Sequence, residues 1–367
     1  MSSKNNNLRE FFMIFGIICE FNPFHAGHKY LIDTIKGEGD GVICAMSSSF
    51  VQRGEAAVYT KFDRAKAAVE NGADLVIELV TPCAVQSAQR FAECGVKLLE
   101  ATGICDTIAF GAECGDTEAL KAVANEIKEK DAEIKKALKG GCSYPAARRQ
   151  VVSSPLLDTP NNILAIEYLS CTKLNAVAVE RIGKGHDSDD ELYSASEIRK
   201  RLADKAELKN CETAVLYKLR TMSEADFAEI EDVSEGLENR IVQALKTARS
   251  LEGLYDAIKT KRYTHSRIRR IILRAYLGIN RGTISTPQYI RVLSMNEKGK
   301  EMLSEIAKFG TLPIVNKYKD AKEIGGKVLE QFENESLYTD IHALCFKEPL
   351  PCEADKTFRL SIVNGIK

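Results

Sequence analysis

Short apolar runs alternate with longer segments of helical periodicity from about residue 11 to residue 205. The runs are FFMIFGIIC (11–19), GVICAM (41–46), DLVIELV (74–80), DTIAFG (106–111) and NAVAVERIG (175–183). Between them lie stretches such as KFDRAKAAVENGA, where Ala and Val recur at intervals of three and four. Strands that are apolar on both faces and separated by helices are typical of a parallel sheet. The pattern predicts an α/β fold with a Rossmann-like, doubly wound sheet, which binds ligands beyond the carboxyl ends of its strands.

The strand-like runs stop after about residue 208. The segments that follow, AVLYKLRTM, LENRIVQALKTAR, LEGLYDAIKT and SRIRRIILRAYLG, all carry helical periodicity. We therefore expect a disordered leader (1–10), a nucleotide-binding catalytic domain (11–208) and a mostly helical, basic domain (209–367). The stretch 310–367 mixes strand-like and helical patterns and predicts no single arrangement.

Composition narrows the class of protein. The 367 residues include 44% hydrophobic and 28% charged side chains, and the formal net charge is −1. A net charge this close to zero gives no overall electrostatic attraction to a polyanion or a membrane surface. Eleven cysteines show no C-x-x-C pair, which favours buried thiols in a reducing compartment, and we expect a cytoplasmic protein. The apolar run 11–19 is too short to span a bilayer, and no membrane association is predicted.

Two histidines follow the first predicted strand. His25 and His28 flank Gly27 in the sequence EFNPFHAGHKYL, where the strand gives way to a helix. A helix N-terminus offers unpaired N–H groups and the positive end of a dipole, and Gly27 allows close approach of a ligand. The spacing predicts a phosphate site; surface residues in a turn and metal ligands are the alternatives.

A second phosphate site is predicted near the end of the domain. In YSASEIRKRL (193–202), Ser194 and Ser196 would cap a helix and contact phosphate, and Arg199 would project from its first turn. Taken alone this is an ordinary helix start. In combination with His25 and His28 it predicts that Arg199 and the two histidines stabilise charge on phosphoryl oxygens.

A polar loop follows the second strand. In SFVQRGE (49–55), Gln52 and Arg53 are placed at the ligand edge of the predicted sheet, where Arg53 would hold a carboxylate or a phosphate. A solvated loop is the alternative.

The helical half carries a local basic signal. Nine Lys or Arg and no Asp or Glu lie between Lys259 and Arg291. A basic helical face suits an RNA backbone, and a solvated basic surface is the alternative. The predicted RNA-binding residues are Lys261, Arg262, Arg267, Arg270 and Arg274, together with Arg148 and Arg149 from the first half.

The H-x-G-H pattern after a buried strand resembles the signature of the nucleotidyltransferase superfamily. Further segments resemble the bacterial tRNA(Met) cytidine acetate ligases and occur in the same order: GIICEFNPFHAGHKYL, SFVQRGEAAVYTKFDRAKAAVENGADLVIEL, AVQSAQRFA, DTIAFGAE, GCSYPAARR, PNNILAIEYL, RIG and TKRYTHSRIRRIILRAYLGI. The resemblance covers most of residues 14–282. The sequence departs from it at MSSS (46–49), where the family has a Gly-Asn pair.

This resemblance implies an ATP-dependent ligase that activates acetate as acetyl-adenylate and acetylates N4 of the wobble cytidine of elongator tRNA(Met). Mg²⁺ is expected with the nucleotide, and no metal site of the protein itself. The resemblance further implies an ATP site formed by Ile18, Cys19, Glu20, Phe21, Asn22, Pro23, Phe24, His25, Ala26, Gly27, His28, Lys29, Tyr30, Leu31, Gly111, Asn162 and Arg181.

Two other functions account for some of the same residues. A small-molecule adenylyltransferase, of the pantetheine-phosphate or nicotinamide-nucleotide type, would use both histidines and Arg199 but leaves the basic helical domain without a purpose. A non-catalytic RNA-binding protein with a vestigial nucleotide fold would not need both phosphate motifs intact.

Overall fold

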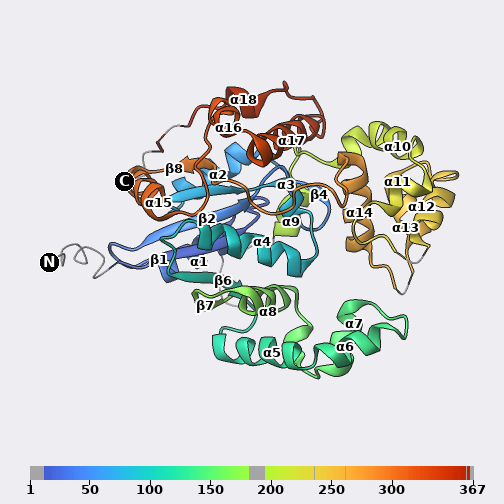
Figure 1. The fold of residues 1–367 in the computed structure, drawn as a ribbon, viewed down its shortest axis with the longest axis horizontal. Helices are drawn as coiled ribbons and strands as arrows, with labels where there is room; N and C mark the ends of the chain where they lie inside the picture. The colour runs from blue at the N-terminus through green and yellow to red at the C-terminus, as the bar shows by residue number, and fades with distance from the viewer. Residues whose placement is uncertain (1–11, 182–194, 235, 261, 361, 364–367) are drawn as a thin grey trace.

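A six-stranded sheet organises the molecule (Figure 1). The computed structural model describes residues 12–181, 195–234, 236–260, 262–360 and 362–363, so the predicted leader lies outside the described residues. The sheet has the order β7-β6-β1-β2-β5-β8, and all pairs are parallel except β5 with β8. Its strands are β1 (Ile14–Cys19), β2 (Gly41–Ser47), β5 (Leu75–Leu79), β6 (Thr107–Ala112), β7 (Asn175–Glu180) and β8 (Val292–Met295). The predicted doubly wound α/β fold is confirmed.

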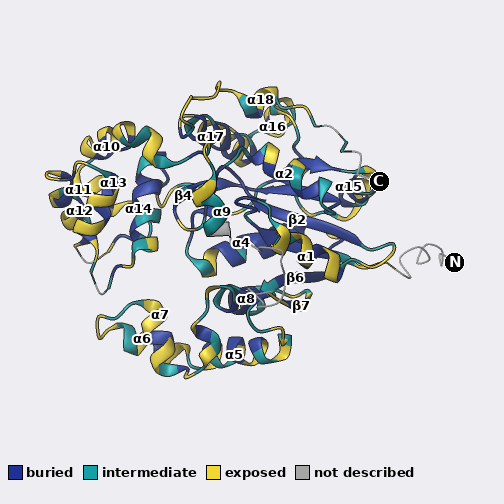
Figure 2. Cartoon of the chain, turned by 180° about the vertical axis from the view of Figure 1, so that it is seen from behind, coloured by how far each residue is buried: buried dark blue, intermediate teal, exposed yellow. Residues whose placement is uncertain are grey.

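Alternation along each strand divides the apolar side chains between two cores. In β1, Ile17 and Cys19 face one core, and Ile18 faces the other. The first core is closed by α1 (Ala26–Ile35) and α2 (Lys61–Glu70), and the second includes residues of α4 (Ala88–Ala101) and α8 (Pro160–Cys171). Figure 2 shows the strands buried and the outer helices exposed on one side. This two-sided burial explains why the strands are apolar at successive positions.

The remaining elements follow in chain order. A short hairpin, β3 (Phe50–Val51) and β4 (Glu55–Ala56), stands outside the main sheet.

No helix within the described ranges is long and apolar enough to cross a membrane. The helices of the first half not yet introduced are α3 (Thr81–Ala84), α5 (Thr117–Glu129), α6 (Asp131–Leu138), α7 (Tyr144–Val151), η1 (Pro155–Leu157) and α9 (Ala195–Arg201).

A helical unit with its own core follows the sheet strands β1–β7 along the chain. Its apolar interior includes Leu219, Phe227, Leu254 and Ile268, each almost fully buried. Figure 1 shows these helices gathered on one side of the sheet. They are η2 (Leu208–Cys211), α10 (Glu212–Arg220), α11 (Glu224–Ala228), α12 (Leu237–Leu245), α13 (Leu251–Ile258) and α14 (His265–Leu277).

The chain then returns to the sheet, which differs from the expectation of one helical domain over 209–367. Strand β8 pairs with β5, and Tyr289 and Phe332 belong to the same core as the sheet. The returning helices are α15 (Glu297–Phe309), α16 (Tyr318–Ile324), α17 (Gly326–Ala343) and α18 (Ala354–Thr357). The sequence pattern missed this return because β8 has only four residues and pairs with a strand more than two hundred positions away.

A buried charge cluster attaches the returning segment to the sheet. Lys61 Nζ lies 2.5 Å from Glu78 Oε1 and 2.8 Å from Asp355 Oδ1, and Arg291 lies 3.3 Å from Glu78 and 3.0 Å from Asp355. All four side chains are fully buried. Burial opposes ionisation of Asp355, but Lys61 and Arg291 hold its pKa below the usual range. The cluster joins α2, β5, the start of β8 and α18.

We expect Asp355→Asn to lower the free energy of unfolding by roughly 3–5 kcal/mol, because two buried cations lose a shared anionic partner. Urea unfolding of the full chain measures the change. Glu323→Gln is the matched control, since its ion pair with Lys319 is exposed and worth about 0–1 kcal/mol. Equal effects of the two substitutions would contradict a structural role for the cluster.

Candidate active site

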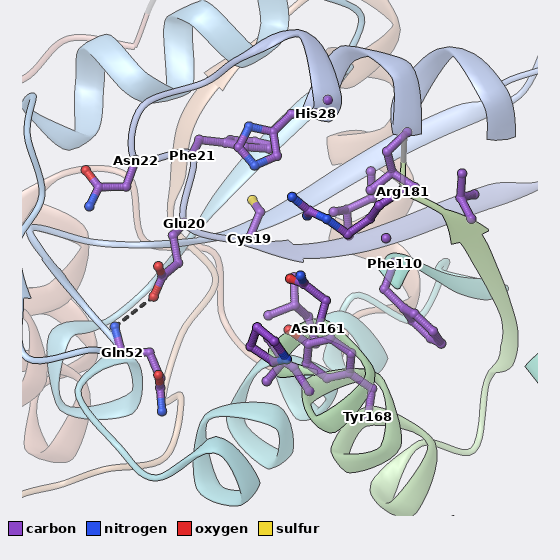
Figure 3. Close-up of a pocket in the computed structure, with 18 of the residues that line it drawn as sticks. Cys19, Glu20, Phe21, Asn22, His28, Gln52, Phe110, Asn161, Tyr168 and Arg181 are labelled. Carbon is purple, nitrogen blue, oxygen red and sulfur yellow. Dashed lines mark hydrogen bonds between the residues drawn. The ribbon is translucent and has the colours of Figure 1, made fainter. Parts of the chain in front are cut away.

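A cavity of about 300 Å³ opens at the carboxyl ends of β1 and β6 (Figure 3). The chain runs from β1 outward to β2 and β5 on one side, and to β6 and β7 on the other. The carboxyl ends of two strands that diverge in this way leave a crevice where ligands bind in doubly wound sheets. In the close-up, the end of β1 and α1 lie on one side of Arg181, and Asn161 and Tyr168 of α8 lie on the other.

His25 and His28 form a reciprocal cap at the start of α1. His25 Nδ1 accepts a hydrogen bond from the Gly27 N–H (3.1 Å), and His28 Nδ1 accepts one from the His25 N–H (3.2 Å). Their rings are stacked with centroids 3.8 Å apart. Because both Nδ1 atoms accept, each neutral ring carries its hydrogen on Nε2. The turn thus offers two Nε2–H donors on adjacent stacked rings.

Both imidazoles are held neutral. Burial lowers the pKa of His25 to about 4, and the nearby Arg181 and Arg199 guanidinium groups add to the effect. Burial also lowers the pKa of His28 well below its ordinary value, with His25 and Arg181 contributing. Neutral His28 therefore lines the same cavity as Arg181 and Arg199, with His25 stacked against it, a combination suited to phosphoryl oxygens.

Arg64 holds the end of β1 in place. Its guanidinium is buried and donates to the carbonyl oxygens of Glu20, Ser47 and Ser48. Phe21, which follows Glu20, has φ +44°, a left-handed backbone conformation that residues other than glycine rarely adopt. Asn22, predicted as an ATP contact, lines the cavity but directs its side-chain oxygen to the Val58 N–H (2.8 Å). These contacts fix the turn that carries the two histidines.

The β3–β4 turn forms another wall. The Gln52 N–H donates to Glu20 Oε1 (2.7 Å), a bond drawn in Figure 3, and its side-chain amide donates to the Gln86 carbonyl oxygen (3.1 Å). Arg53 is exposed and lines the cavity. Burial raises the pKa of Glu20 despite the Gln52 hydrogen bond. The structure therefore brings Gln52 and Arg53 together with the histidine turn.

Helix α8 supplies the opposite wall through a capped N-terminus. Partial burial opposes ionisation of Glu113, but hydrogen bonds from the Asn161 side chain and the Asn162 N–H hold its pKa below the ordinary value. Asn162, the predicted ATP contact, is buried and accepts from the Cys114 N–H (2.9 Å), whereas Asn161 lines the cavity. Asn162 therefore fixes the β6–α5 loop against the N-terminus of α8, and its predicted contact with ATP stays a prediction.

Most of the other predicted nucleotide residues line the cavity. Gly111 lies open to it, and a side chain there would reach Arg181 at 3.5 Å. The predicted residues that line the cavity are Ile18, Cys19, Glu20, Phe21, Asn22, Gly27, His28, Tyr30, Leu31, Gly111, Arg181, Arg199, Gln52 and Arg53. Those outside its lining are Pro23, Phe24, His25, Ala26, Lys29 and Asn162. Ser194 and the side chain of Ser196 lie outside the described residues.

Sequence reasoning missed the apolar wall of the cavity. Phe91 of α4, Phe110 of β6 and Tyr168 of α8 line it, and all three are almost fully buried. Aromatic side chains in such positions read as ordinary core residues, so the sequence contained no signal for their second role. They give the cavity a surface on which a planar base can pack.

Arg199 connects helix α9 to the histidine turn. Its guanidinium donates to the Asn22 carbonyl oxygen (2.7 Å), and the same residue lines the cavity. The structure therefore brings Arg199 of the second motif beside the histidine turn, and its contact with phosphate stays a prediction.

The basic set proposed for RNA divides into two groups. Arg148 is buried against Glu167 (2.5 Å), and Arg274 is buried against Glu231 (2.6 Å), so these two predictions were wrong: both guanidinium groups serve internal ion pairs. Arg149 has a half-exposed side chain, and Arg262, Arg267 and Arg270 are partly exposed. Lys261 lies outside the described residues. Helix α14 has a narrower basic face than its sequence indicates, because its second half is buried almost all round.

Comparison with known proteins gives concordant matches. The family model described as HIGH Nucleotidyl Transferase matches residues 12–215 and 203–356. A tRNA(Met) cytidine acetate ligase of Acetivibrio thermocellus is 34% identical, covering 95% of this chain and 99% of the relative. One of Thermoanaerobacter sp. strain X514 is 37% identical, covering 91% and 96%. A crystal structure of Thermotoga maritima TmcAL bound with alpha-thio ATP superposes with a TM-score of 0.85 at 29% identity, covering 94% of this chain and 98% of that one.

We expect proton NMR to show that His25 titrates near pH 4 rather than near 6.5, because burial and two arginines disfavour its charged form. His25→Asn identifies the resonance, and its carboxamide oxygen preserves an acceptor for the Gly27 N–H. The unfolded chain binds this proton first, so the contribution of His25 to stability declines as pH falls from about 6.5 toward 4. A titration near pH 6.5 would show that water hydrates the ring freely.

Proposed function

This chain belongs to the family of tRNA(Met) cytidine acetate ligases, and on that premise we propose that it joins acetate to N4 of the wobble cytidine of elongator tRNA(Met) at the cost of ATP. The observation that carries the proposal is the neutral His28 ring, stacked on His25, in a cavity that Arg181 and Arg199 also line at the switch point of the sheet. The alpha-thio ATP named for the T. maritima relative supports the binding of a nucleoside triphosphate by this fold.

The cavity divides naturally into a base side and a phosphate side. We assign the adenine base to the apolar wall of Phe91, Phe110 and Tyr168, and the triphosphate to the histidine turn with Arg181 and Arg199. The Nε2–H groups of His25 and His28 donate to phosphoryl oxygens, where charge increases in the transition state. The hydrogen bond from Arg199 to the Asn22 carbonyl oxygen orients its guanidinium group, and the remaining N–H groups of that side chain can donate to phosphate.

Acetate enters beside Arg53, whose exposed guanidinium lines the cavity. A carboxylate oxygen of acetate forms a bond to the α-phosphorus of ATP, the bond from that phosphorus to the bridging oxygen breaks, and pyrophosphate leaves. The product is acetyl-adenylate. The protein supplies position and charge stabilisation, and no protein nucleophile is needed.

We infer that Mg²⁺ accompanies the triphosphate and helps to neutralise its charge. Among the described residues, no group of three or more His, Cys, Asp or Glu side chains is placed to hold a metal. The phosphate oxygens would therefore be the main ligands, as in many nucleotide-dependent enzymes.

In the second step, the cytidine amine forms a bond to the acetyl carbon. The bond from that carbon to the phosphate oxygen breaks, AMP leaves with the electron pair, and the amine releases a proton to solvent. We assign the RNA backbone to the surface of the helical unit, with the partly exposed Arg262 and Arg267, and to the half-exposed Arg149 of α7. All eleven cysteines are free thiols, which suits the reducing cytoplasm where we place the protein.

The small-molecule adenylyltransferase alternative explains the histidine turn equally well. It does not explain the separate helical unit, whereas the similarity to the acetate ligase relatives extends over nearly the whole length of both chains. Acetate-dependent exchange of pyrophosphate into ATP distinguishes the two functions, because only a carboxylate-activating enzyme requires acetate.

We expect His28→Ala to reduce acetate-dependent ATP–pyrophosphate exchange by about 10²–10³-fold, through loss of one transition-state donor, and to leave tRNA affinity within twofold. His25→Asn should also reduce exchange while keeping the helix cap. Asp33→Asn, on the exposed face of the same helix, is the control and should be neutral. Loss of exchange together with loss of tRNA binding would contradict the division of roles.

A further inference from the structure

A second cavity, of about 520 Å³, lies between the β3–β4 hairpin and the helical unit. Its lining comes from β4, from the segment that links α9 to α10, and from α13 and α14. The residues that matter for its chemistry are Glu55, Lys205, Glu252, Tyr255 and Arg269. A cavity of this volume accommodates a ligand of nucleoside size.

The two cavities share a wall. Gln52 and Arg53 of the hairpin line the nucleotide cavity, and Gly54 and Glu55, the next two residues, line the second cavity. Arg199 lines both. A ligand in the second cavity would therefore be adjacent to the phosphate side of the nucleotide cavity, where an acyl-adenylate forms.

Helix α14 fixes the hairpin between the cavities. Gly54 has φ +77°, and a Cβ there would lie 2.5 Å from the backbone nitrogen of Arg270. Only glycine permits this approach without displacement of the turn or the helix. The hairpin part of the boundary is thus a fixed contact between hairpin backbone and helix backbone, and the Arg199 side chain forms the part that borders both cavities.

Arg269 presents an oriented planar group in the second cavity. Its guanidinium lies 3.0 Å from Glu55 Oε1 and 3.6 Å from Glu252 Oε2, and it stacks over the Tyr255 ring at 5.5 Å. Both carboxylates retain oxygen lone pairs for a further donor. Guanidinium planes are a common stacking surface for unpaired RNA bases, and carboxylates accept from the exocyclic amine of cytosine.

The balance of charges in the second cavity argues against an anionic ligand. Four carboxylates, of Glu55, Glu207, Glu212 and Glu252, line it together with the cations Arg199, Lys205, Lys209 and Arg269. Three of these cations are near carboxylates or have backbone partners: Lys205 lies 2.8 Å from Glu207, Arg269 is paired with Glu55, and Arg199 donates to Asn22. A neutral, planar ligand with an amine donor fits this lining better than a phosphate does.

We propose that the second cavity receives the unpaired cytidine of the RNA acceptor, with its base on Arg269 and its amino edge toward Glu55 at the shared wall. This inference rests on the proposed function and assigns the acceptor site of that reaction. Recognition of the amine by a carboxylate also selects against uridine, which presents an oxygen at the same position.

The test separates acetate activation from transfer to RNA. Glu55→Gln, Glu252→Gln and Arg269→Lys are prepared in the full chain, and folding is monitored by thermal unfolding. We expect acetate-dependent ATP–pyrophosphate exchange to stay within twofold of wild type. Acetyl transfer to an anticodon stem-loop with cytidine at the wobble position should fall at least tenfold in kcat/KM for Glu55→Gln and Arg269→Lys. Lys319→Ala, an exposed cation of α16 outside both the cavity and the helical unit, should transfer normally.

A binding measurement supplies the second readout. Wild-type protein should bind the cytidine stem-loop more tightly than the same stem-loop with uridine, and Glu55→Gln should reduce that preference. Transfer within twofold of wild type in all three cavity variants, or undiminished preference in Glu55→Gln, would overturn the inference while leaving the proposed function intact. Absence of any transfer by the wild-type protein, with or without exchange, would overturn the proposed function and this assignment with it.

Discussion

The buried ion pairs of Lys61 and Arg291 with Glu78 and Asp355 are the constraint on which the architecture depends. Charges without water need partners at close range, and these partners come from four separate parts of the chain. Glu78 also accepts from the Ser48 hydroxyl (2.8 Å), and Arg64 donates to the Ser48 carbonyl oxygen and to that of Glu20. The same network thus reaches from the C-terminal helices to the end of β1, where the histidine turn begins.

The site follows from this fixed frame. The end of β1 cannot shift without disturbing Arg64, and the α1 cap orients the two imidazoles through backbone bonds rather than through other side chains. Neutral histidines then serve as donors that keep their hydrogen across the physiological pH range, in contrast with the usual role of histidine as a pH switch. Charge at the site comes from Arg181 and Arg199, whose planar guanidinium groups match phosphate geometry.

Much of the sheet and the histidine turn could be predicted from the sequence, because both depend on local features: the length and spacing of apolar runs, and the residues at the turns between them. The apolar runs marked the strands of the first half, and the His25–Gly27–His28 spacing marked the turn. The return of β8 could not be predicted, since a four-residue edge strand carries almost no periodic signal and its partner is distant in sequence. Arg148 and Arg274 were misassigned for a related reason: a basic residue reads as exposed until its buried carboxylate is found.

The contact of Gly54 with the backbone of α14 couples the motion of the β3–β4 hairpin to that of the helix. A side chain between two elements can rotate and absorb motion, but two backbones at this separation move as one body. A displacement of the helical unit would therefore be transmitted to Gln52, whose N–H holds Glu20 at the rim of the other cavity. If RNA binding produces such a displacement, the two sites are energetically coupled, and the factor by which RNA alters nucleotide affinity equals the factor by which nucleotide alters RNA affinity.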